Sequence, residues 1–442
     1  MNEKNGKFLG IKYSIKHKVQ ALFSEVPLLG WLFGMLIAVV LERFVGEALA
    51  ESLGLPKVPM LFGLVMMLKN PLMIPGTILY LLTIFVLPIC VVARLTSVAT
   101  NRVAAKLLDL PILISVLIHI GLLYAVLYLW SEVSAYRVLT LKLTLIAVIL
   151  TLSLNVINGY MGEFSCSHPG FMALGAYAAS VFTVVFFADD KLFGHALLPA
   201  ALGPFIFPIA LIIGGIVAAL GALAIAIPSF RTRGDYLAII SLAFMFIVKS
   251  MIENLEVVGG PRGLSSQPDL ASLPTVFVWT VACIWITNNF VRSTMGKALN
   301  AVRDDEVAAN AMTVNTRRTK ITAFLFAAFW AGIAGGLFAH VLRYVNPGTF
   351  GLQKLAEVLA MVYFGGLNSV YGSIVGAVSL SMLGEALRPL EIFKWIIIPL
   401  LLILIMIYRP TGLVAFKEFN VGKLVKPKNK SDQRIKDVAA ER

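Results

Sequence analysis

ALIIGGIVAALGALAIAIP, residues 210–228, runs for nineteen residues without a charged or polar side chain. A helix of that length rises by about 28 Å, close to the roughly 30 Å hydrocarbon core of a bilayer. The whole chain is similar, because 59% of its 442 residues are hydrophobic and 14% are charged. Soluble domains carry about a quarter charged residues. The sequence therefore predicts an all-α, polytopic integral membrane protein.

Apolar segments of this kind recur along the chain, and they predict about 10–12 transmembrane or broken helices. The segment 355–366 is too short to cross a bilayer alone. The predicted segments are 26–43, 73–93, 111–130, 138–158, 170–188, 206–228, 235–252, 274–291, 321–342, 355–366, 371–387 and 393–408.

The basic residues follow this topology. With the N-terminus in the cytoplasm and alternating spans, 25 of the 37 Lys and Arg residues fall on the cytoplasmic side. This is the positive-inside pattern, so the net charge of +13 indicates membrane topology and no nucleic-acid partner. We expect both termini in the cytoplasm. The basic stretch before residue 26 lacks the features of a cleaved signal.

After Tyr136, Gly, Ala and Ser recur at regular spacing within the apolar segments, whereas the segments before it are rich in Leu and Val. Rows of small residues let helix backbones approach closely in a membrane. Two such rows are Gly214, Ala218, Ala222 and Ala328, Gly332, Gly336.

Two passages of the chain resemble each other. Each has a small-residue helix (206–228 or 321–342), a polar turn and a short apolar piece (237–247 or 355–366). In the predicted topology they run in opposite directions, which indicates an inverted repeat around a transport path. Chance similarity between two helices rich in Gly and Ala is the alternative.

Polar and Gly-rich stretches at membrane depth are candidates for the lining of that path, because irregular backbone survives there only where protein or water satisfies it. NVINGYMGEFSCSHPGFMALGAY (155–177) and YFGGLNSVYGSIVGA (363–377) are two such stretches. VVGGPRGLSS (257–266) predicts a tight outer loop built on Gly259, Gly260 and Gly263. The predicted path residues are Asn155, Asn158, Ser241, Glu357 and Gly365.

RDDEVAANAMTVNTRRTK, residues 303–320, is the most charged stretch outside the termini. Ser293 or Thr294 can cap one short helix, and Asp304 can cap a second. Helical spacing puts an apolar face on the second helix, which predicts docking into a groove on a partner. A loop helix lying on lipid headgroups is the alternative. The face comprises Val307, Ala308, Ala311 and Met312.

No catalytic or metal-binding constellation is present in the sequence, so neither an enzyme nor a metal site is predicted. The five histidines are scattered, and Cys90, Cys166 and Cys283 lack metal-ligand spacing. The cysteines are interpreted as buried small hydrophobic residues.

EVAANAM (306–312) resembles the EAA loop of ABC importer permeases, which docks into the nucleotide-binding subunit. The order of the surrounding motifs is similar to that of LivM-type permeases of branched-chain amino acid ABC transporters. The similarity covers roughly residues 136–413, with Thr313 where the family usually has Gly and Arg262 where it has Asn. The motifs are GYMGEFSCSHPGFMALGAY, RTRGDYLAIISLAF, GGPRGL, MGKALNAVRDDEVAANAMTVN, VNPGTF, GGLNSVYGSIVGA and YRPTGL.

This resemblance implies three parts: an N-terminal extension (1–135) with a basic cytoplasmic tail and about three spans, an ABC permease core (136–413), and a basic cytoplasmic tail (414–442). It implies a LivH-like partner permease, two ATPase subunits like LivG and LivF, and a periplasmic substrate-binding protein. It implies no cofactor for this chain. The residues implied to dock the ATPase are Arg303, Glu306, Val307, Ala308, Ala311 and Met312.

Two other functions stay open at the level of sequence. Urea or short-amide permeases share these motifs, so the transported substrate is not decided. A secondary transporter that uses Glu357 or His168 is a further alternative, because ionisable groups at membrane depth are functional candidates by default.

Overall fold

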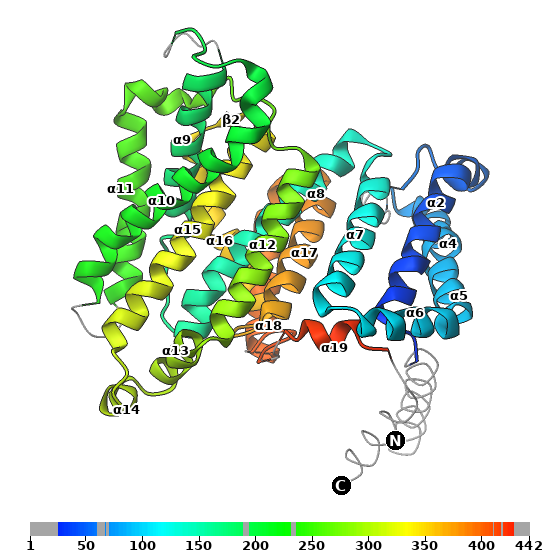
Figure 1. Ribbon diagram of the computed structural model, residues 1–442. Coiled ribbons are helices and arrows are strands. Elements are labelled where there is room, and N and C mark those ends of the chain that lie inside the picture. The colour runs from blue at the N-terminus through cyan, green and yellow to red at the C-terminus, as the bar shows by residue number, and fades with distance from the viewer. Residues whose placement is uncertain are drawn as a thin grey trace, which may run out of the picture. The chain divides into compact units, whose positions relative to one another are not determined.

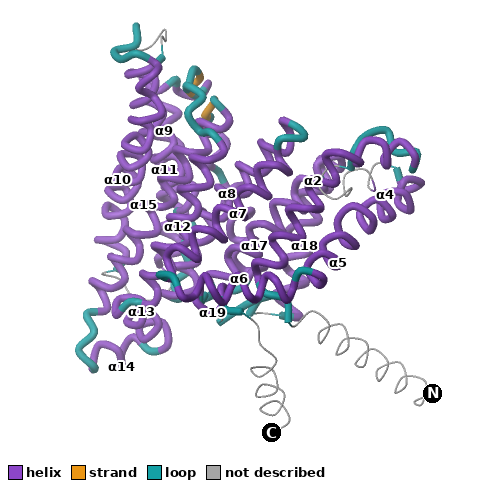
Figure 2. The backbone as a smooth tube through the Cα atoms, turned by 45° about the vertical axis from the view of Figure 1, so that its right-hand side comes forward, coloured by secondary structure: helices purple, strands orange, loops and turns teal. Residues whose placement is uncertain are grey.

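The computed structural model describes residues 25–59, 67, 70–188, 194–230, 236–409, 411–416 and 419–427. Nearly all the ordered backbone in these ranges is helical (Figures 1 and 2). The chain divides into two compact units, one running to Arg137 and including the residues from Asn420, and the other from Val138 to Phe419. The all-α class predicted from the sequence is confirmed.

The first unit is a small group of apolar helices in which α2 packs against α5 and α7. Gly34 permits the approach to α5, because a Cβ there would lie 2.9 Å from the Ile89 carbonyl oxygen. Its elements are α2 (Leu28–Ser52), η2 (Pro71–Met73), α4 (Ile74–Leu81), the π-helical η3 (Leu82–Val86), α5 (Leu87–Leu95), α6 (Ser97–Asp109), α7 (Ile112–Ser131) and α19 (Val421–Val425).

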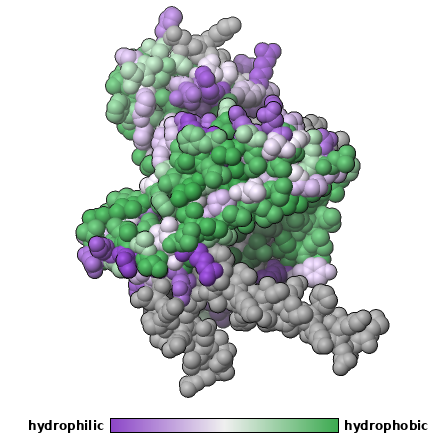
Figure 3. Space-filling view, turned by 90° about the vertical axis from the view of Figure 1, so that its right-hand side faces the viewer, coloured by the Kyte–Doolittle hydropathy of each residue, from purple (hydrophilic) through white to green (hydrophobic). Residues whose placement is uncertain are grey.

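Large hydrophobic side chains cover the outside of this unit. Phe44 is 81% exposed and Leu95 is 77% exposed. Figure 3 shows a broad apolar surface on the face of the molecule that it views. Exposing an apolar surface of this extent to water is unfavourable in free energy, so the surface suits contact with lipid.

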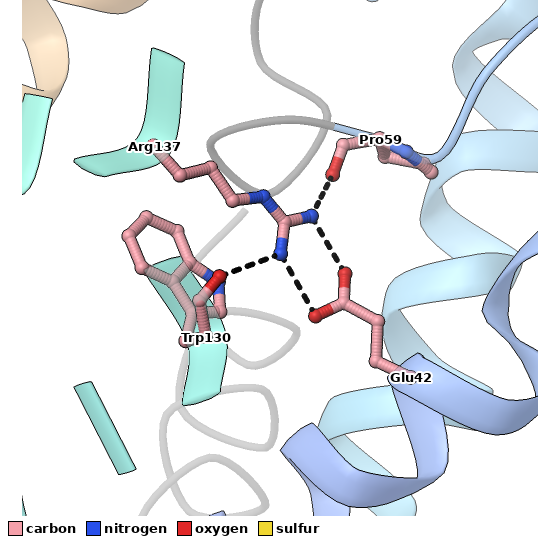
Figure 4. Close-up of polar contacts among 4 residues, drawn as sticks. All are labelled: Glu42, Pro59, Trp130 and Arg137. Atoms are coloured by element: carbon pink, nitrogen blue, oxygen red, sulfur yellow. Dashed lines mark hydrogen bonds and ion pairs between the residues drawn. The ribbon is translucent and has the colours of Figure 1, made fainter. Parts of the chain in front are cut away.

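A buried ion pair lies among these apolar helices (Figure 4). Arg137 Nη2 lies 2.7 Å from Glu42 Oε1, and Arg137 Nη1 lies 3.0 Å from Glu42 Oε2. The guanidinium group also donates to the carbonyl oxygens of Trp130 and Pro59, and both charged side chains are 1% exposed. A bidentate pair with further hydrogen bonds is the arrangement that two buried charges need.

Glu42→Ala is expected to destabilise the protein by about 3–5 kcal/mol, because it leaves the Arg137 charge buried without its partner. The measurement is thermal unfolding of the purified full chain in detergent. Glu132→Ala is the matched control, because it breaks the Arg43–Glu132 pair, whose side chains are 52% and 44% exposed. The control should lose less than about 1 kcal/mol. Equal losses in the two variants would contradict this account of the buried pair.

The second unit contains the remaining helices. The helix α8 begins at Ala135 in the first unit and continues to Asn155 in the second. The elements are α8 (Ala135–Asn155), the π-helical η4 (Val156–Met161), α9 (His168–Phe187), η5 (Ala200–Leu202), α10 (Gly203–Ser229), α11 (Tyr236–Asn254), η6 (Glu256–Val258), η7 (Gly260–Arg262), β1 (Leu264–Ser265), α12 (Leu273–Arg292), α13 (Thr294–Asp304), α14 (Glu306–Ala311), α15 (Thr316–Leu342), β2 (Tyr344–Val345), η8 (Pro347–Phe350), α16 (Leu352–Gly365), α17 (Val370–Ala386), η9 (Arg388–Leu390) and α18 (Glu391–Tyr408).

The core of this unit is formed by α9, α10 and α15, which pack against one another. The two rows of small residues predicted from the sequence meet there. A Cβ on Gly332 of α15 would lie 2.6 Å from the Ala218 Cβ and 2.8 Å from the Gly214 carbonyl oxygen on α10. Glycine is therefore required at residue 332 for close backbone approach, as in other membrane helix pairs.

Nine helices in the described ranges are long and apolar enough to cross a membrane. Each of the twelve predicted segments overlaps a helix, and α16, with 14 residues, is the short one. The prediction that 237–247 is a short piece is wrong, because α11 spans 19 residues to Asn254. Its pattern continues without a helix breaker, and Lys249 and Glu253 pair across one turn at 3.7 Å.

Candidate functional site

The helices α13 and α14 stand at one end of the second unit, opposite the end that carries β2 (Figure 1). Ser293 caps α13, and its Oγ accepts from Gly296 N at 3.4 Å. Asp305 caps α14, and its Oδ1 accepts from Val307 N and Ala308 N at 2.9 Å. The prediction that Asp304 caps α14 is wrong. Asp304 is the last helical residue of α13, whereas Asp305 has the extended backbone that an N-cap residue needs.

The predicted apolar face of α14 is exposed. Val307 is 80% exposed and Met312 is 77% exposed, and Ala308 and Ala311 are exposed between them. Ala309, on the opposite side of the helix, is 5% exposed and holds α14 against the rest of the unit. We call the surface formed by Val307, Ala308, Ala311 and Met312 the α14 face. Thr313, directly after Met312, has a φ of 69°, a left-handed conformation that glycine adopts more readily.

Lys320 connects α14 to the Gly-rich segment that follows α8. Its Nζ lies 2.7 Å from Glu163 Oε1 and 2.8 Å from Glu306 Oε2. The Lys320 side chain is only 10% exposed, whereas Glu163 is 26% and Glu306 is 50% exposed, so the lysine end of this bridge is the part shielded from solvent. Since Glu306 is the first residue of α14, Lys320 joins the start of α14 to Glu163.

Arg303 makes a second connection to the same segment. Its Nη1 donates to the Gly159 carbonyl oxygen in η4 at 3.3 Å, and its guanidinium also pairs with Asp304. The Arg303 side chain packs on Gly162, which has a φ of 77°. A side chain at residue 162 would collide with Arg303, so glycine is needed here for both space and conformation.

Asn155 joins the end of α8 to the turn between α16 and α17. Its Nδ2 donates to Ser373 Oγ at 2.6 Å and to the Ser369 carbonyl oxygen at 3.1 Å. Its Oδ1 accepts from Asn368 N at 3.1 Å, and Gly366 has a φ of 126° in the same turn. The side chain is 1% exposed. Asn155 therefore satisfies polar backbone groups in a turn at membrane depth.

Two further residues expected on the path also hold irregular backbone. The Asn158 Oδ1 accepts from Ser165 N at 3.3 Å, and the Ser241 Oγ accepts from Cys166 N at 2.9 Å. Ser241 is fully buried. Asn158 thus joins the non-helical segment before α9 to η4, and Ser241 joins it to α11.

The pieces 237–247 and 355–366, which belong to the two similar passages of the chain, both lie beside residues 155–175. Cys166, Met245 and Leu355 form one buried cluster there, with Leu242 and Leu359 packed against it. The structure thus brings α11, α16 and this stretch together.

Glu357 and Gly365 lie in different surroundings. Glu357 Oε2 is 3.0 Å from Lys354 Nζ, and both line a cavity of about 90 Å³ together with Glu385. Gly365 packs on the Gly372 carbonyl oxygen of α17. The five predicted path residues therefore do not line one common cavity among the described residues.

The loop built on Gly259, Gly260 and Gly263 adopts left-handed backbone at all three glycines. It leads into β1, which pairs with β2 through Leu264–Val345 and Ser265–Tyr344. The Tyr344 hydroxyl donates to the Arg262 carbonyl oxygen at 2.7 Å. Two motifs about 80 residues apart, GGPRGL and VNPGTF, thus form one structure at the end of the unit opposite α14 (Figure 2).

Neither Lys320 nor Glu163 was singled out from the sequence. The signal that was available is the position of Lys320 inside the first turns of a long apolar helix, where a charge needs a partner. No group of three His, Cys, Asp or Glu residues in the described ranges could hold a metal ion.

Lys320→Met is expected to loosen α14, because it removes charge-assisted hydrogen bonds that contribute about 2 kcal/mol. Backbone amides in 306–312 should exchange hydrogen about thirtyfold faster, as measured by mass spectrometry. Lys354→Met is the control, since it breaks a lysine–glutamate pair elsewhere in the unit. If α14 exchanges equally fast in Lys320→Met, Lys354→Met and the unsubstituted protein, Lys320 does not hold it.

Comparisons with known proteins agree on one family. Residues 136–408 match the family described as branched-chain amino acid transport system / permease component. No solved structure gives a significant match.

Curated relatives carry related names. The chain is 32% identical over 307 residues to the high-affinity branched-chain amino acid transport system permease protein LivM of Escherichia coli (strain K12). The alignment covers 62% of this chain and 68% of that protein. LivM of Salmonella typhimurium is 31% identical with the same coverage. The permease protein BraD of Pseudomonas aeruginosa is 28% identical over 148 residues, 32% of this chain and 47% of BraD.

Proposed function

The chain belongs to the family of permease components of branched-chain amino acid transport systems, and from this premise we propose that it is one half of the membrane pore of an ATP-driven importer for branched-chain amino acids. It is an integral protein of the inner membrane. The observation that carries the proposal is the exposed α14 face, which the Lys320 bridge joins to the Gly-rich segment.

The partners follow from this role. A LivH-like permease completes the pore, two ATPase subunits like LivG and LivF bind on the cytoplasmic side, and a periplasmic binding protein delivers the substrate. The chain itself is not an enzyme, because ATP is hydrolysed on the partner subunits. The α14 face supports this division of work, since four apolar side chains in water are stabilised when a groove on an ATPase subunit covers them.

Motion in the ATPase subunits reaches the membrane through two contacts of the docking helices. The first is the pair of salt bridges by which Lys320 links Glu306 to Glu163, and the second is the hydrogen bond from Arg303 to the Gly159 carbonyl oxygen. Both contacts end in the segment that continues α8 beyond Asn155. Because packed interfaces have discrete arrangements, a small displacement there switches the unit between outward-open and inward-open states.

The path passes the irregular backbone around Asn155, Asn158 and Ser241 in the first half of the permease core. Glu357 and Gly365 line it from the second half of the core. Both termini and α14 face the cytoplasm, and the loop of Gly259, Gly260 and Gly263 faces the periplasm. The division into an extension (1–135), a permease core (136–413) and a C-terminal tail (414–442) is part of this proposal, although the residues from Asn420 belong to the first compact unit.

The test is reconstitution of the whole complex in liposomes with its binding protein. We expect uptake of labelled leucine, isoleucine and valine that requires ATP on the cytoplasmic side. Uptake of urea or acetamide in place of these amino acids would contradict the proposed substrate. Uptake driven by a proton or sodium gradient without ATP would contradict the importer class.

A further inference from the structure

The helix α6 of the first unit lies across the ends of its neighbours, and nothing in the proposed transport function uses it. It follows directly on α5, which ends at Leu95, and it leads into α7, which begins at Ile112. It also contacts the start of α2, because a Cβ on Gly30 would lie 3.1 Å from Thr100 Oγ1. Figure 1 shows α6 crossing the ends of α2, α5 and α7. Since the helices that it joins are long and apolar enough to cross a membrane, α6 lies at the boundary between hydrocarbon and water.

The two sides of α6 differ in character. One side packs on its own unit, where Thr100 is 8% exposed and Ala104 is fully buried. The other side carries Arg102 and Lys106, which are exposed and lie four residues apart, so they are neighbours on the helix surface. Arg94, one residue before the end of α5, is exposed as well. Three cationic side chains thus extend from this end of the unit.

These three cations are not neutralised by the protein. None of Arg94, Arg102 and Lys106 forms an ion pair with another residue in the part of the chain that the structure describes. The sequence of α6 contains one carboxylate, Asp109, at its last residue. The positive charge at this end of the unit is therefore available to an anion outside the chain.

Apolar side chains flank the two cations of α6. Val98 is 61% exposed and Val103 is 48% exposed. At about 100° of rotation per residue, Val98 lies on one side of the row formed by Arg102 and Lys106, and Val103 lies on the other side. A cationic row between apolar edges is the pattern of a helix in a membrane interface, because the edges contact acyl chains while the long basic side chains reach the headgroups.

We infer that α6, together with Arg94, binds the headgroups of acidic phospholipids such as phosphatidylglycerol. The lipid phosphate accepts charge-assisted hydrogen bonds from Arg94, Arg102 and Lys106, and the acyl chains contact Val98 and Val103. Phosphatidylcholine fits less well, because its own cation balances its phosphate. A free phosphate ion fits less well, because it leaves the two valines in water.

Lipid bound at α6 stabilises the first unit. Because α6 contacts α2, α5 and α7 together, a lipid that binds the folded helix favours the arrangement in which these helices are packed. Added phosphatidylglycerol should therefore raise the temperature at which the purified chain unfolds in detergent, and added phosphatidylcholine should raise it less.

The experiment titrates the full chain with lipid in an uncharged detergent and counts the bound lipids by native mass spectrometry. Phosphatidylglycerol is compared with phosphatidylcholine of the same acyl chains. We expect phosphatidylglycerol to bind about a hundredfold more tightly at the first site that fills, because three cations favour the anionic headgroup. Inorganic phosphate in tenfold excess should not displace it.

Three double variants locate the site. Arg102→Ala with Lys106→Ala should weaken phosphatidylglycerol binding about thirtyfold, since it removes two of the three cations. Arg102→Lys with Lys106→Arg keeps both charges and should keep the affinity. Arg262→Ala with Arg343→Ala is the matched control, because it removes two exposed cations from the second unit, and it should bind lipid like the unsubstituted chain. All four side chains are exposed, so the substitutions leave the packing of the core unchanged.

Several results would overturn the inference. They are equal affinity for the two lipids, unchanged affinity in the Arg102→Ala and Lys106→Ala variant, or an equal loss in the control. Displacement of the lipid by inorganic phosphate would mean that the cations bind a free anion. A photo-crosslinking residue at Val98 in intact cells should capture phospholipid, and capture of a protein there in place of lipid would mean that α6 is a protein interface.

Discussion

Ala308→Glu is expected to abolish ATP-driven uptake. Ala308 lies on the α14 face, and a carboxylate there would enter the proposed groove on the ATPase subunit without a partner. Burying such a charge costs at least about 4 kcal/mol, which weakens docking about a thousandfold. The measurements are substrate-stimulated ATPase activity of the purified complex and co-purification of the ATPase subunits.

Asn310→Glu is the matched control for this variant. Asn310 is also exposed on α14 but lies outside the α14 face, so a carboxylate there stays in solvent. It should retain most of the stimulated activity. The docking role is rejected if Ala308→Glu transports at the unsubstituted rate, or if the two variants lose activity equally.

Gly332→Val should cause a large loss of stability in the core of the second unit. The added Cβ would meet the Ala218 Cβ at 2.6 Å, the Gly214 carbonyl oxygen at 2.8 Å and the Gly215 Cα at 3.0 Å. Backbone atoms cannot move aside as a flexible side chain can. We expect a cost of about 3 kcal/mol or more, measured by thermal unfolding in detergent.

Gly121→Val controls for placing a β-branched residue in an apolar helix. No atom lies within 4 Å of a Cβ built on Gly121, so only the small difference in helix propensity remains. A stability loss in Gly332→Val no larger than that in Gly121→Val would mean that α10 and α15 are not held by close backbone approach.

The sequence predicted the helices well because a bilayer imposes a length and a polarity on every spanning segment. The short α16 was predicted for the same reason, since Gly365 and Gly366 end the helix after 14 residues. The span predicted over 235–252 agrees with α11, whereas the short piece predicted over 237–247 does not. Lys249 and Glu253 interrupt the apolar run without ending the helix, and they pair with each other on its surface.

The α14 face was predictable because its members are close in sequence and helical spacing alone sets their common side. The contact between Glu163 and Lys320 was not, since 157 residues separate them and only the tertiary fold brings them together. The same holds for the hydrogen bond between Asn155 and Ser373, which are 218 residues apart in the sequence.

If the α14 face docks an ATPase subunit, as proposed, a photo-crosslinking residue at Val307 should capture that subunit in intact cells. Val278, on α12, is the control position, since it is 62% exposed, close to the 80% exposure of Val307. We expect Val307 to crosslink to a protein identified by mass spectrometry as an ABC ATPase, and Val278 not to crosslink to it. Crosslinks from Val307 to lipid alone, or to a protein without a nucleotide-binding domain, would contradict it.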